Sequence, residues 1–345
     1  MSIKEKLEMV KKSLWMLEVK ADEANHTGNT GAGEEFVDTA LSTSILEKLR
    51  EATNFSSKFP APIVMPTSTY ELPVEWADPI FNYTGENGDV PASEYANSKV
   101  WTGKIVLSAK KFTAITYLSG ELDEDAIVNM RGYVEDKLVK SYQETLDKVL
   151  INGDTETGAT GNINSVDAAP AAGSYYLAMN WLRKNALANG MTIDAGALEL
   201  ADIRAGRALM GQKGLNPSEL IFGVWTDVYF KLLSLTQAET VEKFGNGATV
   251  LQGTIPVIDG VEVAATSFIA KTQADGTISE DPANNTVGQG ILVYKQDVIR
   301  GFKRDLKTFV EYLPRVDQYA ITAHFRYAQL VRDTDSVVAI NNITL

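Results

Sequence analysis

Residues 119–150 predict a single amphipathic helix that is unusually long for a globular domain. Ser119 is the expected N-cap, and the positions after it are acidic, which the positive end of a helix dipole favours. The apolar face consists of Leu122, Ala126, Ile127, Met130, Tyr133, Val134, Leu138, Tyr142, Leu146 and Val149. Asn152-Gly153-Asp154 ends the helix with turn residues. At 1.5 Å per residue such a helix measures about 45 Å.

A long β-hairpin is predicted just before this helix, at residues 63–110. Residues 63–83 have a strand-like pattern but contain prolines, which confine such a run to a sheet edge or an arm. Residues 84–98 form a polar tip, and the strand pattern returns at 100–106 and again at 112–118. An isolated hairpin is only marginally stable in water. It therefore needs a surface to lie on, and that surface need not belong to the same chain.

The segment before the hairpin reads as an arm. A helix is predicted over residues 3–20 from apolar side chains at three- and four-residue steps, namely Ile3, Leu7, Val10, Leu14 and Leu17. The polar, glycine-rich stretch 25–33 separates it from a short helix at 41–52. The first helix is thus tethered, and two interpretations stay open. It either binds a partner during assembly or packs on its own domain.

A mixed region and a β-rich tail follow the long helix. Residues 155–175 predict a loop of unusual length, which is typical of functional or mobile segments. Further helices are expected at 176–189, 198–212 and 226–235, strands at 220–224, 254–257, 261–264 and 290–294, and a polar loop at 271–290. Strand patterns then return at 306–312 and 319–340. The fold class expected from this order is α+β.

The composition argues against most catalytic chemistries. The chain has no cysteine, which excludes disulfides, thiolate metal sites and cysteine nucleophiles. Its two histidines, His26 and His324, nearly exclude a histidine-rich metal centre. The formal net charge of -13 argues against wrapping duplex DNA by phosphate neutralisation. No stretch approaches 18 uninterrupted apolar residues and no signal peptide is visible, so no membrane partner is expected.

Three polar clusters are better explained by structure than by ligand binding. Gly28–Gly33 has the glycine content of a phosphate loop but lacks a preceding strand and a following lysine. The cluster of Glu121, Asp123, Glu124 and Asp125 could serve metal or acid–base chemistry. Its consecutive positions fan around the helix, however, and capping of the dipole is favoured. Asn152-Gly153-Asp154 lacks the spacing of a calcium loop.

The remaining candidates are the histidines and two basic groups. A serine triad would have to recruit His26 or His324, and no G-x-S-x-G elbow is present. The basic groups, Lys110-Lys111 and Arg300-Lys303-Arg304-Lys307, are interpreted as solvated strand ends or subunit-contact charges rather than nucleic-acid sites. We therefore predict a protein that is not an enzyme, with no catalytic, cofactor-binding or metal-binding residues and no cofactor.

The order of these elements resembles the tailed-bacteriophage major capsid protein family. Residues 111–119, leading into the acidic helix, resemble the junction between that family's E-loop and its spine helix. Leu150-Ile151-Asn152-Gly153-Asp154 resembles the L-L-N-G-D end of the spine helix. Residues 215–229, with a strand followed by Trp225-Thr226-Asp227-Val228-Tyr229, resemble the strand–helix unit of the family's A-domain. Thr254-Ile255-Pro256-Val257 resembles its G-x-P-V segment, and residues 323–340 resemble its last P-domain strand. The resemblance covers about residues 34–345, and the order and spacing of the motifs carry it.

The resemblance implies a domain plan and a role. The plan is an N-terminal helix and glycine-rich linker (1–33), an N-arm (34–62), an E-loop hairpin (63–110), a P-domain with spine helix (111–155), an A-domain (156–298) and C-terminal P-domain strands (299–345). The role is a subunit that self-assembles into hexamers and pentamers of an icosahedral head shell around double-stranded DNA, without sequence-specific binding. Scaffold, portal and possible decoration proteins would be partners, with assembly in the host cytoplasm and residence in the virion.

Two departures from the family and three rivals complete the expectations. Some members crosslink through an E-loop lysine, but here Val90 stands at that place, so no crosslink is expected. Only about 30 residues precede the arm, which favours a separate scaffold protein or scaffolding by the 3–20 helix. The rivals are an encapsulin-like compartment of the same fold, an α/β enzyme with a lid at 155–175, and another virion component such as a tail-tube or minor coat protein.

Overall fold

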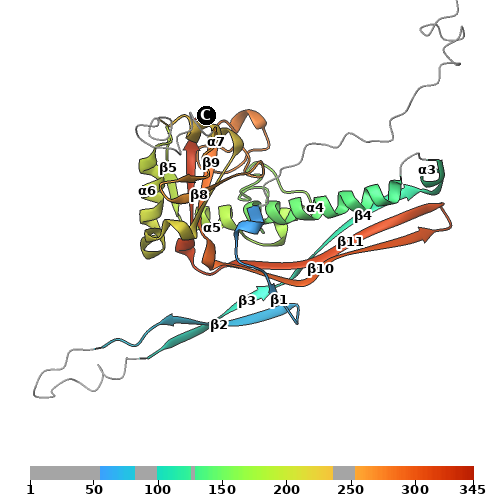
Figure 1. The fold of residues 1–345 in the computed structure, drawn as a ribbon, viewed down its shortest axis with the longest axis horizontal. Helices are drawn as coiled ribbons and strands as arrows, with labels where there is room; N and C mark the ends of the chain where they lie inside the picture. Colours follow the sequence, from blue (N-terminus) through green and yellow to red (C-terminus); the bar gives the residue numbers. More distant parts are fainter. Residues whose placement is uncertain (1–54, 82–98, 126–128, 236–252) are drawn as a thin grey trace, which may run out of the picture. The chain divides into compact units, whose positions relative to one another are not determined.

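A computed structural model describes residues 55–81, 99–125, 129–235 and 253–345 (Figure 1). The chain divides into two units, Met1–Lys48 and Leu49–Leu345, and all described residues belong to the second. The helices predicted at 3–20 and 41–52, the glycine-rich linker at 25–33 and the hairpin tip at 84–98 lie outside those ranges.

The first sheet has four strands in the order β1-β10-β11-β4. They are β1 (Ile63–Val64), β4 (Lys110–Ser119), β10 (Val298–Leu313) and β11 (Gln318–Val331). The long antiparallel pair β10–β11 turns at Asp317, whose φ is 47°. Strand β4 pairs with β11 from Lys110–Tyr327 to Ser119–Gln318. The strand patterns predicted at 112–118 and 306–312 are thus confirmed, and both strands are longer than expected.

The long helix is two helices, α3 (Gly120–Asp125) and α4 (Met130–Asn152), so the prediction of one helix is wrong. Asn129 takes an extended conformation, and its side-chain oxygen accepts a hydrogen bond from the Gly132 N–H at 3.1 Å. Asparagine competes for backbone donors in this way and so begins a new helix. The predicted end at Asn152 is confirmed. With 23 residues, α4 is about 34 Å long at 1.5 Å per residue.

Helix α4 packs along the four-stranded sheet (Figure 1). Leu138 on α4 packs with Ile321 and Ala323 on β11 in one apolar cluster. One turn further along α4, the Tyr142 ring meets the Phe325 ring edge-on at 4.8 Å, and its hydroxyl donates to Asp305 at 2.9 Å. These contacts supply the burial that the apolar face of the helix predicts.

The second sheet has six strands in the order β5-β12-β9-β6-β8-β7. They are β5 (Thr192–Asp194), β6 (Leu220–Val224), β7 (Val257–Ile258), β8 (Val261–Ala265), β9 (Gly288–Tyr294) and β12 (Val337–Ile343). Strand β6 is buried throughout, as its run of apolar residues predicts. The turn between β7 and β8 uses positive φ at Asp259 and Gly260. The strand predicted at 261–264 is β8, whereas the strand predicted at 254–257 is wrong except for Val257, the first residue of β7. Residues 299–345 contribute to both sheets, because β12 lies in this one.

Short helices and 3₁₀ turns connect the strands. They are α5 (Leu182–Ala188), α6 (Leu200–Leu209), α7 (Thr226–Leu233) and the 3₁₀ turns η2 (Phe55–Lys58), η3 (Tyr175–Ala178), η4 (Gly211–Leu215), η5 (Pro217–Glu219), η7 (Pro282–Asn284), η8 (Lys295–Asp297) and η9 (Thr334–Ser336). Of these, α5, α6 and α7 contribute to the apolar cores on the second sheet. The helix predicted at 176–189 is wrong as a continuous element, because the backbone is extended at Met179 between η3 and α5. The helix predicted at 198–212 is the shorter α6.

Two apolar cores lie on the two faces of the six-stranded sheet. Alternate residues of β12 divide between them, with Val337 and Ala339 in one core and Val338 and Ile340 in the other. The first core also holds Phe55, Phe59, the end of α4 and α5, while the second holds residues of α6 and α7. The end of α4 is thereby fixed to the six-stranded sheet.

The hairpin predicted over 63–110 is present but shorter, as a separate two-stranded sheet of β2 (Thr69–Ala77) and β3 (Trp101–Ser108). The two ends of the predicted range instead belong to β1 and β4 of the four-stranded sheet. The register of β2 and β3 runs from Thr69–Ser108 to Ala77–Trp101, with an irregularity between Glu75 and Ala77. The end near residues 70 and 107 packs on the body through a small cluster that contains Met65, Leu107 and Ala328. No helix among the described residues is long and apolar enough to cross a membrane.

Candidate assembly surface

The acidic cluster predicted at the start of the long helix lies on the six-residue helix α3. Glu121 and Glu124 are exposed there, and Asp123 and Asp125 belong to the same helix. Within the described ranges, no group of three histidine, aspartate or glutamate side chains is placed to hold a metal ion. Glu121 and Glu124 therefore place exposed negative charge on this short helix.

The Asn152-Gly153-Asp154 stop has a second role that the sequence did not reveal. The Asp154 side chain is fully buried and accepts hydrogen bonds from the backbone N–H of Ile163 at 2.8 Å and Glu156 at 3.1 Å. Lys184 forms an ion pair with it at 3.0 Å. These contacts fix the start of the 155–175 loop against the end of α4, so that part of the loop is a structured element.

Arg183 is a second buried charge that pattern reasoning missed. It is fully buried, yet its guanidinium donates to neutral oxygens, at 2.6 Å to Gln289 and 2.8 Å each to the Asn152 side chain and the Gly276 carbonyl. A further bond reaches the Asn164 side chain at 3.1 Å. Burial lowers the pKa of Arg183 to about 10, so it stays charged at neutral pH. One side chain thus joins α5, the end of α4, two loops and β9.

His324 lies within the four-stranded sheet. It lies on β11 opposite Lys307 of β10 and Thr113 of β4. Its Nδ1 is 3.3 Å from the Thr113 hydroxyl, and its ring lies 5.8 Å from that of Phe309. The other histidine, His26, and the loop Gly28–Gly33 lie outside the described residues.

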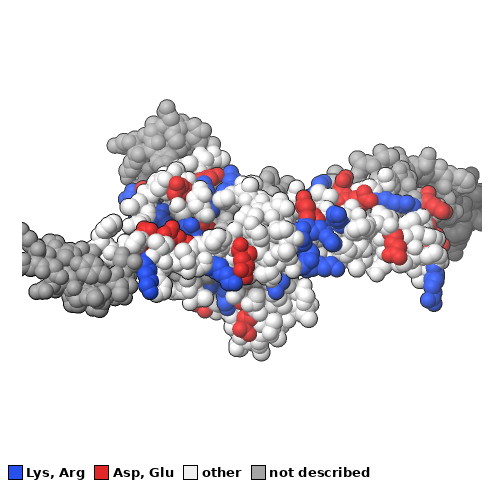
Figure 2. Space-filling model, turned by 90° about the horizontal axis from the view of Figure 1, so that it is seen from below, with Lys and Arg blue, Asp and Glu red and all other residues white. Residues whose placement is uncertain are grey.

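The two predicted basic groups split into anchors and surface charges. Arg300 is buried and donates to the carbonyls of Phe59 at 3.0 Å and Pro60 at 2.6 Å, while Lys303 donates to the Pro66 carbonyl. These two residues hold the chain that precedes the hairpin. The exposed members are Lys110, Lys111, Arg304 and Lys307. Figure 2 shows one face of the molecule on which lysine and arginine side chains gather near the middle, beside large uncharged areas.

The far end of the β2–β3 hairpin exposes large apolar side chains. Trp76, Val100 and Trp101 are each more than half exposed, and Phe81 is fully exposed. Trp76 lies over Gly103, where a methyl group would overlap its indole. Soluble proteins rarely leave such a cluster in water, and an apolar patch of this kind marks an interaction surface.

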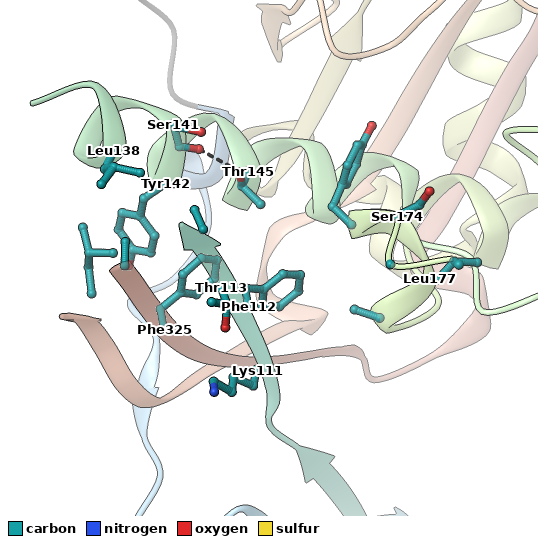
Figure 3. Close-up of a pocket in the computed structure, with 16 residues that line it drawn as sticks. Lys111, Phe112, Thr113, Leu138, Ser141, Tyr142, Thr145, Ser174, Leu177 and Phe325 are labelled. Carbon is teal, nitrogen blue, oxygen red and sulfur yellow. Dashed lines mark hydrogen bonds between the residues drawn. The ribbon is translucent and has the colours of Figure 1, made fainter. Parts of the chain in front are cut away.

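An open pocket of about 440 Å³ lies between α4, β4 and the segment 173–178 (Figure 3). Phe112 and Phe325 stack at 4.8 Å in its wall, and Tyr142 points from α4 toward Phe325. The lining also includes the polar residues Ser141, Thr145, Ser174 and Lys111. Polar atoms make up nearly half of the exposed lining, so the aromatic rings form only one part of the wall.

Comparison with known proteins identifies the family. A family model described as the phage capsid family matches residues 33–215. The major capsid protein of Escherichia phage T5 is 23% identical over 199 residues, which span 57% of this chain and 38% of the T5 protein. The match thus covers well under two thirds of that relative's length.

Solved structures share the fold across nearly the whole chain. The capsid of a native GTA particle superposes with a TM-score of 0.62 at 12% identity, covering 93% of this chain and 99% of that one. The capsid structure of the cyanophage P-SCSP1u gives 0.63 at 14% identity, covering 94% and 98%. The α+β, tailed-phage capsid fold predicted from the order of elements is therefore confirmed, and the chain belongs to the phage capsid family.

Proposed function

We propose that this chain is a major capsid protein that self-assembles into the icosahedral head shell around phage double-stranded DNA. The observation that carries the proposal is the β2–β3 hairpin, which forms its own two-stranded sheet and leaves Trp76, Phe81 and Trp101 exposed at its far end. Such a hairpin is marginal alone, and a neighbouring subunit supplies the missing burial. Family membership supports the same role.

The domain plan expected from the sequence is part of this proposal. The hairpin at 63–110 is the E-loop, α4 is the spine helix of a P-domain at 111–155, and the six-stranded sheet forms most of an A-domain at 156–298. The segment 299–345 returns to the P-domain with β10 and β11, and its β12 joins the A-domain sheet. The N-arm (34–62) and the N-terminal segment (1–33) precede the hairpin.

The proposed partners follow from the shell. Copies of the chain form hexamers and pentamers, and scaffold, portal and decoration proteins act with them. DNA is enclosed without sequence-specific contacts, consistent with the net charge of -13. The subunit assembles in the host cytoplasm and resides in the virion, and it works as a structural protein without an active site.

Electron microscopy of the purified, concentrated protein tests the proposal. We expect closed icosahedral shells, alone or after addition of a scaffold protein expressed from the same phage. Particles that carry a protein cargo and no genome in infected cells would support the encapsulin-like rival instead. Monomers that never assemble under either condition, together with absence of the chain from purified virions, would contradict the proposal.

We also predict that mature shells carry no covalent link between subunits through the hairpin tip. Val90 occupies the position at which some relatives carry a crosslinking lysine, and it lies outside the described residues. Particles boiled in denaturing detergent should run as a single band of 37.6 kDa. A ladder of dimers, trimers and larger species would show that the prediction is wrong.

A further inference from the structure

Two short connections between the four-stranded and the six-stranded sheet lie side by side. The 3₁₀ turn η8 leads from β9 of the six-stranded sheet to β10 of the four-stranded sheet, and residues 332–336 lead from β11 back to β12. The backbone N–H of Arg332 in the second connection donates to the Asp297 carbonyl in the first at 2.8 Å. Figure 1 shows β10 and β11 running in a different direction from β8 and β9, so the chain changes direction at these connections.

A cluster of charges occupies this junction, and Asp297 is its central member. The Asp297 side chain is fully buried and accepts a hydrogen bond from the hydroxyl of Ser336, which is equally buried. Its two carboxylate oxygens form ion pairs with Lys213 at 2.8 Å and with Arg332 at 2.6 Å. Lys213 reaches a second carboxylate, that of Asp333, also at 2.8 Å. Two cations thus meet two carboxylates where the chain passes between the sheets.

Lys213 is the member of the cluster that comes from outside the two connections. It lies on η4, between α6 and β6, so its side chain joins a segment beside the six-stranded sheet to both connections at once. Its Nζ donates to the Ser336 hydroxyl at 2.8 Å, in addition to the carboxylates of Asp297 and Asp333. An ammonium has three N–H donors, and each of them has an acceptor here.

The apolar part of the junction does not define an angle in the same way. Val298, Val331 and Val337 lie in the first apolar core together with the end of α4. Apolar burial is not directional, and cores that keep their apolar volume lose a unique arrangement before they lose stability. Hydrogen bonds and ion pairs depend on distance and angle, and buried charges in some proteins specify one arrangement rather than add stability.

We propose that Lys213 acts as a latch that sets the angle between the four-stranded and six-stranded sheets, and thereby the curvature of the shell. The proposal rests on the proposed shell function and adds the residue that fixes the internal geometry of the subunit. Whether repeated contacts between identical copies close depends on the rotation between them. An error in the angle within one subunit recurs in every copy, so the latch controls the diameter of the particle.

The distance between two spin labels tests the latch in the unassembled subunit. The natural chain has no cysteine, so Glu311→Cys on β10 and Ala205→Cys on α6 introduce the only labelling sites, and both positions are exposed. Pulsed electron paramagnetic resonance should give one narrow distance distribution for this labelled protein. Adding Lys213→Met should make the distribution at least twofold broader, because both sheets stay folded while the angle between them varies.

The matched control is Lys271→Met. Lys271 pairs with Asp227 at 3.7 Å, and the two side chains are 44% and 48% exposed, so this pair lies outside the buried cluster. Its distribution should equal that of the natural chain. If Lys213→Met does not fold by circular dichroism, Asp333→Asn decides, since it weakens the latch and leaves Asp297 paired; a smaller broadening is expected. An unchanged distribution in whichever of these two variants is folded would overturn the proposal.

Electron microscopy gives the corresponding readout in the assembled state. Shells of Lys213→Met should spread over a range of diameters at least twice as wide as that of Lys271→Met shells. Lys213→Met shells of the natural, uniform diameter would contradict the link between the latch and curvature. Failure of the unsubstituted protein to form shells would instead contradict the shell function, whereas the spin-label distances test the latch without assembly.

Discussion

Replacing Arg183 with methionine should destabilise the subunit by about 3–5 kcal/mol, because the buried oxygens that accept its hydrogen bonds lose their donor and gain no water in its place. The guanidinium supplies hydrogen bonds to Gln289, Asn152 and the Gly276 carbonyl, all within 2.8 Å. Methionine fills a similar volume but donates nothing, so these oxygens remain buried and unsatisfied. Urea unfolding followed by circular dichroism measures the change as a lower midpoint at unchanged slope.

The matched control for this prediction is Arg204→Met. Arg204 pairs with Asp259 at 2.9 Å, but its side chain is 62% exposed, so water replaces the lost partner. Its unfolding midpoint should stay close to that of the natural chain. The unfolding midpoint of Arg183→Lys should lie between those of the two methionine variants. A lysine ammonium keeps the charge but cannot reach all the oxygens that the forked guanidinium contacts. Equal midpoints for both methionine variants would show that the buried network contributes little.

Replacing the exposed aromatic residues of the hairpin should abolish shell formation without unfolding the subunit. In a Trp76→Ser, Phe81→Ser, Trp101→Ser variant, every subunit loses the exposed aromatic side chains of its hairpin. Aromatic residues that act as hot spots contribute about 2 kcal/mol or more each to the binding free energy of an interface. The loss recurs at every contact of the lattice. Light scattering should therefore show no particles at concentrations at least tenfold above those at which the natural chain assembles.

The control for the assembly variant changes exposed residues on the other face of the hairpin. Glu71→Gln with Lys104→Gln removes an exposed ion pair of 2.8 Å and leaves the aromatic residues in place. This variant should assemble nearly as well as the natural chain, because exposed ion pairs contribute little. Circular dichroism should show both variants folded. Normal assembly of the triple serine variant would mean that the hairpin end is not a subunit contact.

The sequence predicts elements well where local chemistry decides the structure. Strand β6 follows from its uninterrupted apolar run, and the end of α4 follows from Asn152-Gly153. The break at Asn129 escaped prediction because the apolar spacing continues across it, and the competing side-chain hydrogen bond leaves no trace in periodicity. The hairpin was predictable from its strand pattern. The exposure of its aromatic side chains was not, because it depends on which part of the apolar face of the hairpin packs against the rest of the folded chain.

The buried charges mark the limit of sequence reasoning. Arg183 sits in a short helix where an arginine is usually solvated, and its burial depends on Gln289, which lies 106 positions later. Asp154 reads as an ordinary turn residue, but its carboxylate is covered by a loop whose path the sequence does not encode locally. Such sites arise from tertiary packing, so periodicity and composition cannot reveal them.

The strand orders also set when a newly made subunit can fold. Strand β4 pairs with β11, where Thr113 contacts His324, a residue 211 positions later in the sequence. Likewise, β6 pairs with β9, and β5 pairs with β12. A ribosome releases β4 and α4 long before these partners are synthesised, and contacts so distant in sequence form slowly. Helix α4 and both sheets are therefore expected to complete their folding together, after translation of β12. A nascent chain on a polysome consequently carries the β2–β3 strands before Ala328, one of the residues on which the near end of the hairpin packs, has been synthesised.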